Sequence, residues 1–168
     1  MGEKKPIFSK KEIKYSGLFN LVEVQKFVMG WFANHGLDMV EEMTSEQVFP
    51  EGKQIDYSYK PYKKFTDFAK MIIWFDAEFT DVQEVTVEID GVKKKMNKGS
   101  ITFTITGYLE TDYENKWETK AFYYFLKIVF EKFMLGSHQS YYKSTITTTC
   151  NQLIEELKAL LNMNRFKV

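Results

Sequence analysis

The chain has 168 residues, with 23 basic and 23 acidic side chains and a formal net charge of zero. Aromatic residues make up 17% of it, which excludes an intrinsically disordered chain, because disorder goes with few aromatics and high net charge. Arg165 is the only arginine, and a neutral, arginine-poor surface argues against a dedicated nucleic-acid-binding protein. No apolar run is long enough to span a membrane as a helix.

The cysteine content and the first residues bear on compartment and domain organisation. Cys150 is the single cysteine, so the chain cannot close an intramolecular disulfide. The first residues contain no apolar stretch typical of a secretory signal, and we expect a reducing, cytoplasmic location. Residues 1–10 are rich in charge and are expected to form a mobile tail, which leaves residues 11–168 as one domain.

The first elements of the domain are predicted to be a strand and a helix. Residues 11–19 are compatible with a strand, and apolar residues then recur at helical spacing over 20–35. Asn20 is a suitable N-cap and Glu23 follows it at capping-box spacing. Gly36 can adopt the left-handed conformation that ends a helix.

A strand-rich middle section follows. Residues 37–49 and 53–60 are predicted strands, separated by a turn at Pro50-Glu51-Gly52. Residues 84–111 alternate in the manner of a hairpin with a long or bulged connection, within which Asp90-Gly91 can start a turn. Gly107 is expected to mark a bulge or a close approach of another segment.

The segment 65–80 is the most informative stretch. Strand side chains point alternately to opposite faces, and every odd position from Ala69 to Phe79 is apolar. The even positions are apolar only in the middle, and β-branched and aromatic content favours a strand over a helix. This strand is therefore predicted to have one wholly apolar face and one face with an apolar centre.

Two helices are predicted at the C-terminal end. The helical period begins near residue 118, and Gly136 is a suitable residue to end that helix. A last helix follows, and the β-branched run Thr145–Thr149 indicates that it begins only near Thr149.

These elements predict an α+β fold. It consists of an antiparallel meander of about five to six strands, one N-terminal helix and two C-terminal helices. The order loosely resembles the helix-grip arrangement, in which a curved antiparallel sheet wraps a long C-terminal helix. The resemblance is one of topology alone.

Residues with catalytic or metal-binding chemistry are few. His35 is expected to cap the first helix, His138 lies between the predicted helices, and Cys150 falls on an apolar stripe as a buried structural cysteine. So few histidines and cysteines predict no metal site, and we expect no cofactor. Asp76 and Glu78 share a strand face beside Trp74, where a carboxylate pair can perform acid–base work or can simply lie at the solvated end of the face. We favour a protein that is not an enzyme, and an enzyme that works with carboxylates such as these and with tyrosines is the third alternative.

A second candidate function comes from mixed aromatic and basic residues. Residues 57–65 combine four tyrosine or phenylalanine rings with three lysines, and Lys93–Lys95 and Lys98 lie in the predicted hairpin. Aromatic stacking beside a basic groove is typical of single-stranded nucleic-acid binding. Lysines also protect exposed sheet edges from aggregation, and we favour that role here over a nucleic-acid partner.

The leading hypothesis concerns the second face of the 65–80 strand. Phe68, Ile72 and Trp74 need cover if helices occupy the other face. The first helix can pack there, a protein partner or second copy can dock there, or the sheet can curve around an apolar ligand. We predict an interaction protein that self-associates or binds a protein partner through these residues.

The alternative is a helix-grip-like carrier of a small apolar ligand, held between the sheet and the C-terminal helix. Apolar pockets are lined mainly by aliphatic and aromatic side chains. The predicted wall residues are Phe103, Ile105, Phe125 and Phe130.

Overall fold

The computed structural model describes residues 3–39, 41–113 and 121–165. Within these residues the fold is an antiparallel sheet of six strands with two helices, which confirms the predicted α+β class but with one helix fewer. The elements are β1 (Glu3–Phe19), α1 (Leu21–Asn34), β2 (Glu41–Phe49), β3 (Gly52–Tyr59), β4 (Tyr62–Lys64), β5 (Ala69–Ile89), β6 (Val92–Thr111) and α2 (Ala121–Arg165).

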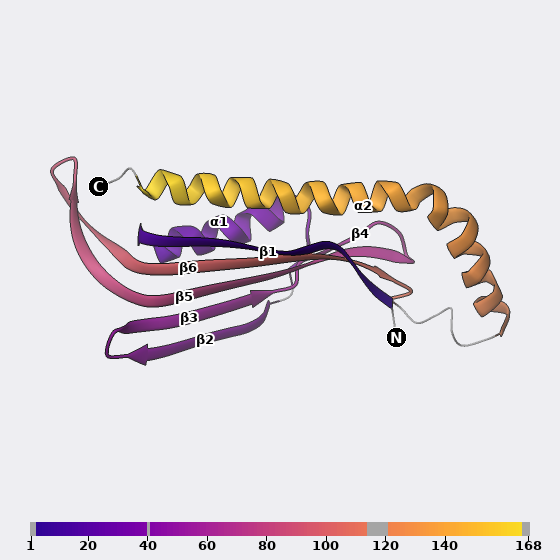
Figure 1. Cartoon of the computed structure of the whole chain (residues 1–168), viewed down its shortest axis with the longest axis horizontal. Coiled ribbons are helices and arrows are strands. Elements are labelled where there is room, and N and C mark those ends of the chain that lie inside the picture. Colours follow the sequence, from indigo (N-terminus) through magenta and orange to yellow (C-terminus); the bar gives the residue numbers. More distant parts are fainter. Residues whose placement is uncertain (1–2, 40, 114–120, 166–168) are drawn as a thin grey trace.

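The strands lie in the order β1-β6-β5-β3-β2, and the short β4 pairs with β5 beyond the end of β3. Apart from β4, the strands from β2 to β6 follow one another in space as they do along the chain. The first strand then closes the sheet beside the last one, at the edge opposite β2 (Figure 1).

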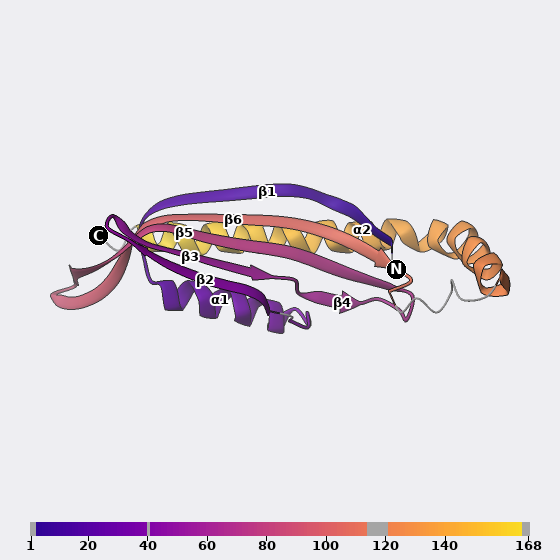
Figure 2. The same ribbon diagram turned by 90° about the horizontal axis from the view of Figure 1, so that it is seen from below.

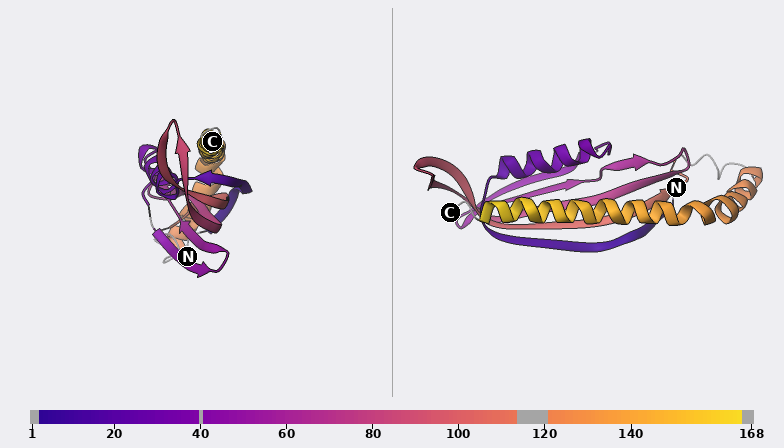
Figure 3. Two further views of the ribbon diagram at one scale, coloured as in Figure 1. Left: turned by 90° about the vertical axis from the view of Figure 1, so that its left-hand side faces the viewer. Right: turned by 90° about the horizontal axis from the view of Figure 1, so that it is seen from above.

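Both helices cover the same face of the sheet. Seen from below, the strands lie in front of α2 (Figure 2), and seen from above they lie behind it (Figure 3, right). Helix α1 lies on the same side of the sheet as α2. The aromatic ring of Phe32 from α1 packs edge-on against Phe75 of β5, with 5.6 Å between ring centroids. The possibility that the first helix covers the second face of the 65–80 strand is therefore wrong, and the molecule has two layers.

Helix α1 begins and ends as its sequence predicts. The Asn20 side chain accepts hydrogen bonds from the backbone N–H groups of Val22 and Glu23, at 3.1 and 3.2 Å. These bonds satisfy donors that an α-helix leaves open at its first turn. Gly36 follows the C-cap residue His35 with φ of +65°, so the helix stops in the left-handed conformation expected of this glycine.

The hairpin of β5 and β6 differs from the predicted one. Its turn has two residues, Asp90 and Gly91, both with positive φ, and Ile89 pairs directly with Val92. The predicted long or bulged connection is therefore wrong. A two-residue turn of this kind matches the twist of the flanking strands. The irregularity lies between Thr80 and Gln83, where the register shifts; it interrupts the alternation of side chains without ending the strand.

Residues 3–10, which we expected in a mobile tail, form the first part of β1. They pair with the end of β6, and the Phe8 side chain is buried in the core. Register shifts on both sides of Phe8 interrupt the pattern that predicts a strand. Charged residues are common on edge strands, where they protect against aggregation. Because residues 3–10 are rich in charge for this reason, their sequence predicts a tail rather than a strand.

Helix α2 is continuous through Gly136 and through Thr145–Thr149, so the two predicted C-terminal helices are one. A glycine inside a helix costs only about 1 kcal/mol relative to alanine. Ile146 and Cys150 are fully buried against the sheet, and this packing offsets the weak helix propensity around them. The N-terminal part of α2, orange in Figure 1, extends past the end of the sheet and curves downward there.

Gly107 marks a close approach, as predicted. A Cβ atom built on Gly107 would lie 2.8 Å from Ile146 Cγ2 and 3.0 Å from Cys150 Sγ. Helix α2 therefore crosses β6 at Gly107, where no glycine side chain separates the two. Among the described helices, none combines the length and the apolar character needed to cross a membrane.

Candidate interaction surface

The sheet face that the helices leave open is the candidate site, and we call it the outer face. It is formed by the even-numbered positions from Lys70 to Thr80 on β5 and from Ser100 to Glu110 on β6. The odd-numbered positions of the same stretches are buried under the helices. On the outer face Trp74 and Tyr108 are partly buried, whereas Asp76 and Glu78 are exposed.

One end of the outer face combines aromatic rings with lysines, and we call it the aromatic–lysine end. The rings of Trp74 and Tyr108 lie 4.6 Å apart, and Lys60 Nζ lies 4.8 Å from the centre of the Trp74 ring. Lys70 Nζ lies 5.4 Å from the Tyr62 ring, and a cation over an aromatic face is attracted by its quadrupole. Lys64, Lys70 and Tyr113 make a further group of this kind, with 5.5 and 4.8 Å between the ammonium groups and the ring.

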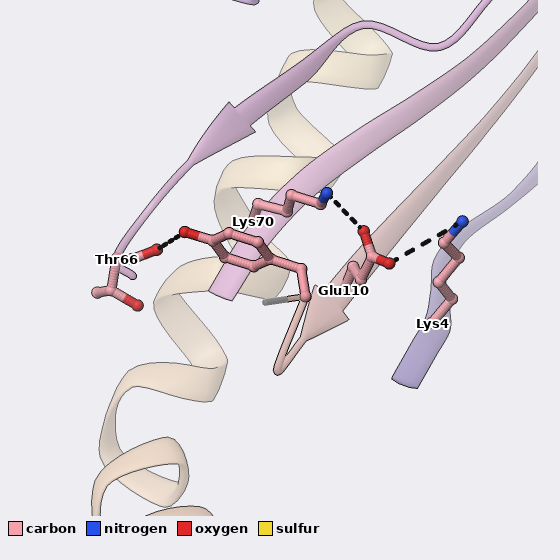
Figure 4. Close-up of polar contacts among 5 residues, drawn as sticks. Lys4, Thr66, Lys70 and Glu110 are labelled. Carbon is pink, nitrogen blue, oxygen red and sulfur yellow. Dashed lines mark hydrogen bonds and ion pairs between the residues drawn. The ribbon is translucent and has the colours of Figure 1, made fainter. Parts of the chain in front are cut away.

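Glu110 partly neutralises this end. Its carboxylate lies 2.9 Å from Lys70 Nζ and 4.0 Å from Lys4 Nζ, with the three residues on adjacent strands (Figure 4). Only 11% of the Glu110 side chain is exposed, so this ion pair is held more firmly than a typical surface pair. The Tyr113 hydroxyl donates a hydrogen bond to the backbone carbonyl oxygen of Thr66, at 3.0 Å.

The centre of the outer face is acidic. Asp56 of β3 stands directly opposite Glu78 of β5, and Asp76 is one outer-face position away. Like charges at opposite cross-strand positions destabilise a sheet. Asp76 accepts a hydrogen bond from the Ser58 hydroxyl at 2.6 Å. We call Asp56, Asp76 and Glu78 the acidic trio.

The three predicted interface residues do not lie together. Ile72 and Trp74 are on the outer face, where Ile72 pairs with Tyr62 on one side and Tyr108 on the other. Phe68 precedes β5 and belongs to the core cluster on the helix side. The Thr66 hydroxyl accepts hydrogen bonds from the N–H groups of Phe68 and Ala69, so the chain turns there before the strand begins.

The predicted wall residues of a ligand pocket are also separated. Phe103 and Ile105 have no exposed surface and lie in the core, where Phe103 packs against Phe75 at 5.6 Å. Phe125 lies on the first part of α2 and is 61% exposed. The Phe130 side chain lies outside the described residues.

The histidines and the cysteine have structural surroundings. The His35 ring stacks on Trp31 at 3.8 Å, and its Nδ1 lies 2.8 Å from the Trp31 carbonyl oxygen. His138 and Cys150 share α2, twelve residues apart, which is about 18 Å along a helix and excludes a catalytic pair. Burial raises the pKa of the Cys150 thiol to about 12, so the reactive thiolate is disfavoured. In the described part of the chain, no three histidine, cysteine or acidic side chains are grouped to hold a metal ion.

The basic and aromatic residues proposed for nucleic acid are divided between distant places. Tyr59 is buried on the helix side against Phe75, whereas Lys60 and Tyr62 reach the outer face. Lys93–Lys95 follow the β5–β6 turn, at the end of the hairpin far from Trp74. The structure therefore does not assemble them into one groove.

Several residues of the outer face escape prediction from sequence. Tyr108 and Glu110 come from β6, Asp56 comes from β3, and only the strand register brings them beside Trp74 and Glu78. The alternation of residues 100–111 indicates that Tyr108 lies on the polar side of that strand, because Tyr108 takes the next place in the series after the threonines. Searches among protein-family models, curated proteins and solved structures found no match to this chain.

Proposed function

We propose that this chain is a non-enzymatic interaction protein that docks another protein surface on its outer face. The observation that supports the proposal is the one-sided cover of the sheet by α1 and α2. In a two-layer protein, the sheet face that no helix covers is in contact with water, and its side chains are expected to be polar. Here that surface holds the partly exposed rings of Trp74 and Tyr108 beside the buried side chain of Ile72, and aromatic residues are enriched at protein interfaces.

A protein partner suits this surface better than single-stranded nucleic acid does. Stacking sites for bases need aromatic faces that are open to the ligand. The Trp74 ring packs against Tyr108 on one side and has Lys60 over it. The acidic trio follows directly along the same face and would repel phosphates.

The weaker alternative is a carrier of a small apolar ligand. We propose for it a helix-grip-like arrangement, with the ligand between the sheet and the C-terminal helix. Its support is the position of β1 beside β6, with the long α2 lying across them. A ligand between sheet and helix needs space there, but Phe103 and Ile105 fill the core and Gly107 lies against α2. We also propose a cytoplasmic location, for which the buried thiol of Cys150 is the support.

Photo-crosslinking in the natural host tests the docking role. Benzoylphenylalanine replaces Thr106, which pairs with Trp74 on the outer face, and in a control it replaces the exposed Asn151 on α2. Irradiation is expected to link the Thr106 variant to a protein and to leave the Asn151 variant unlinked. Absence of adducts at Thr106, or adducts with nucleic acid alone, would contradict the proposal.

A further inference from the structure

We propose that β2 is a docking edge for an extended, basic segment of a partner protein, which adds to the sheet as a further strand. The site is an edge of the sheet rather than its outer face, so the inference goes beyond the docking role proposed above and is tested separately. In the described part of the chain, β2 is the last strand on its side of the sheet and pairs only with β3. The backbone N–H and C=O groups on its other side are therefore a template for another strand.

The two edges of the sheet differ in how they are protected against the addition of a strand. At the β1 edge, Pro6 lacks a backbone N–H group, register shifts interrupt the strand on both sides of Phe8, and five of the 17 residues are lysines. Strand β2 contains no lysine, arginine or proline, and it pairs with β3 without a register shift from Met43 to Phe49. The edge at β2 is therefore the more suitable of the two to accept a strand.

The side chains of β2 are exposed, although several of them are apolar. From Met43 to Phe49 no side chain is buried, and the exposed fraction is 56% for Met43 and 74% for Val48. A strand that buries none of these side chains adds little to the core, whereas exposed apolar side chains that lie together mark interaction sites. An added strand would cover them on one side, because side chains at opposite positions of paired strands lie about 4.5–5.5 Å apart.

The charge of this edge favours a basic partner over a second copy of the same edge. Strand β2 contains three glutamates and no basic residue. Lys53 of β3 forms an ion pair with one of them, Glu46, at 3.0 Å. The next carboxylates inward are Asp56 of β3 and Glu78 of β5, which stand opposite each other. Two copies of β2 side by side would bring like charges together, whereas a strand with lysine or arginine is attracted.

Ser45 brings Asp56 within reach of a basic side chain on the added strand. Ser45 of β2 stands directly opposite Asp56, and its own side chain is short. A residue opposite Ser45 on the added strand lies two strand spacings from Asp56, or about 9.6 Å. The long side chain of an arginine or lysine can extend over Ser45 and pair with the Asp56 carboxylate. Such a contact would offset the repulsion between Asp56 and Glu78.

The apolar side chains of β2 define the rest of the partner segment. Met43 comes two positions before Ser45 and Phe49 comes four positions after it, so all three lie on the same side of the strand. An antiparallel partner, which continues the pattern of this sheet, meets Phe49 first and Met43 last. The expected segment therefore has an apolar residue, three further residues, a basic residue, one further residue and a second apolar residue.

Titration of the full-length protein with a synthetic strand, followed by NMR, tests the inference. The probe is the acetylated peptide Gly-Val-Val-Thr-Thr-Arg-Thr-Val-Gly, which has the expected order of residues. It should slow amide exchange at alternate residues from Met43 to Phe49, because only every second N–H group of an edge strand points outward. Asp56→Lys should raise the dissociation constant at least about threefold, and a probe with glutamate in place of arginine should prefer that variant to the wild type. Glu155→Lys, at an exposed position of α2, is the control and should leave binding unchanged.

Three results would overturn this inference. The first is unchanged amide exchange along β2 at millimolar probe, and the second is binding that does not follow the exchange of charge between Asp56 and the probe. The third is protection of β2 that grows with protein concentration when the probe is absent, which would assign the edge to a second copy. Adducts from position 106 report on the outer face alone, so failure at β2 leaves the docking role standing, and absence of those adducts leaves the β2 inference standing.

Discussion

Gly107 is a residue at which helix α2 rests directly on the sheet, and its missing side chain is a requirement of the packing. Gly107→Ala places a methyl group 2.8 Å from Ile146 Cγ2 and 3.0 Å from Phe8 Cβ, so α2 must move outward. We expect a loss of about 1–3 kcal/mol in the free energy of unfolding, measured by urea denaturation.

Gly30 provides the matched control for this substitution. It lies inside α1, and a Cβ atom there meets nothing within 4 Å. Gly30→Ala should raise the free energy of unfolding by about 0.5–1 kcal/mol, because alanine favours the helix. Equal effects of the two substitutions would show that α2 does not rest on Gly107.

Cys150 gives the protein a defined response to alkaline pH. Its thiol ionises near 9.0 in an accessible setting, but burial raises its pKa in the fold to about 12. Above pH 9 the unfolded chain therefore releases a proton that the folded chain keeps, and stability falls until pH reaches about 12.

Comparison with Cys150→Ala isolates this contribution from other titrating groups. The wild type should lose up to about 1.4 kcal/mol per pH unit relative to the variant above pH 9, and nothing below it. The measurement is the free energy of unfolding of both proteins from pH 7 to 11. A difference that stays constant over this range would mean that water reaches the thiol in the folded protein.

At the scale of elements, helix α1 depends on its N-cap. Asn20→Ala removes the acceptor for two backbone N–H groups at the first turn. We expect a loss of about 1 kcal/mol in the free energy of unfolding, with the helix otherwise retained. Asn34→Ala, at the exposed last position of α1, serves as the control. A loss of the same size in both variants would assign the effect to helix propensity rather than to capping.

The elements also show which parts of the fold can be predicted from the local sequence and which cannot. Asn20 and Gly36 bound α1 through contacts within a few residues, and the alternation of 69–80 within the predicted 65–80 strand is imposed by burial on one side. These features were predicted. The continuity of α2 through Gly136 was not, because it depends on packing of Ile146 against Gly107, far away in the sequence.

The residues of the candidate site likewise divide into those that local sequence predicts and those that depend on contacts far apart in the sequence. Ile72 and Trp74 were predicted on one face, because strand periodicity alone places them there. Phe68 was grouped with them because the turn at Thr66, which directs it into the core, is not visible in the apolar pattern. Asp56 joins Glu78 only through the register of β3 on β5, which no local signal specifies.

At the scale of the whole molecule, the arrangement of layers decides what the outer face can do. A sheet covered by both helices on one side keeps its other side for contact with solvent or with another molecule.

The most direct measurement of this account is hydroxyl-radical footprinting of the full-length protein, purified and in extract of the natural host. Trp74 and Tyr108 on the outer face are the reporters, and Tyr141 on α2, 62% exposed, is the reference. The account predicts that oxidation of Trp74 and Tyr108, relative to that of Tyr141, is lower in the extract than in the purified protein. Equal relative oxidation of Trp74 and Tyr108 in the two samples, or protection of Tyr141 instead, would contradict it.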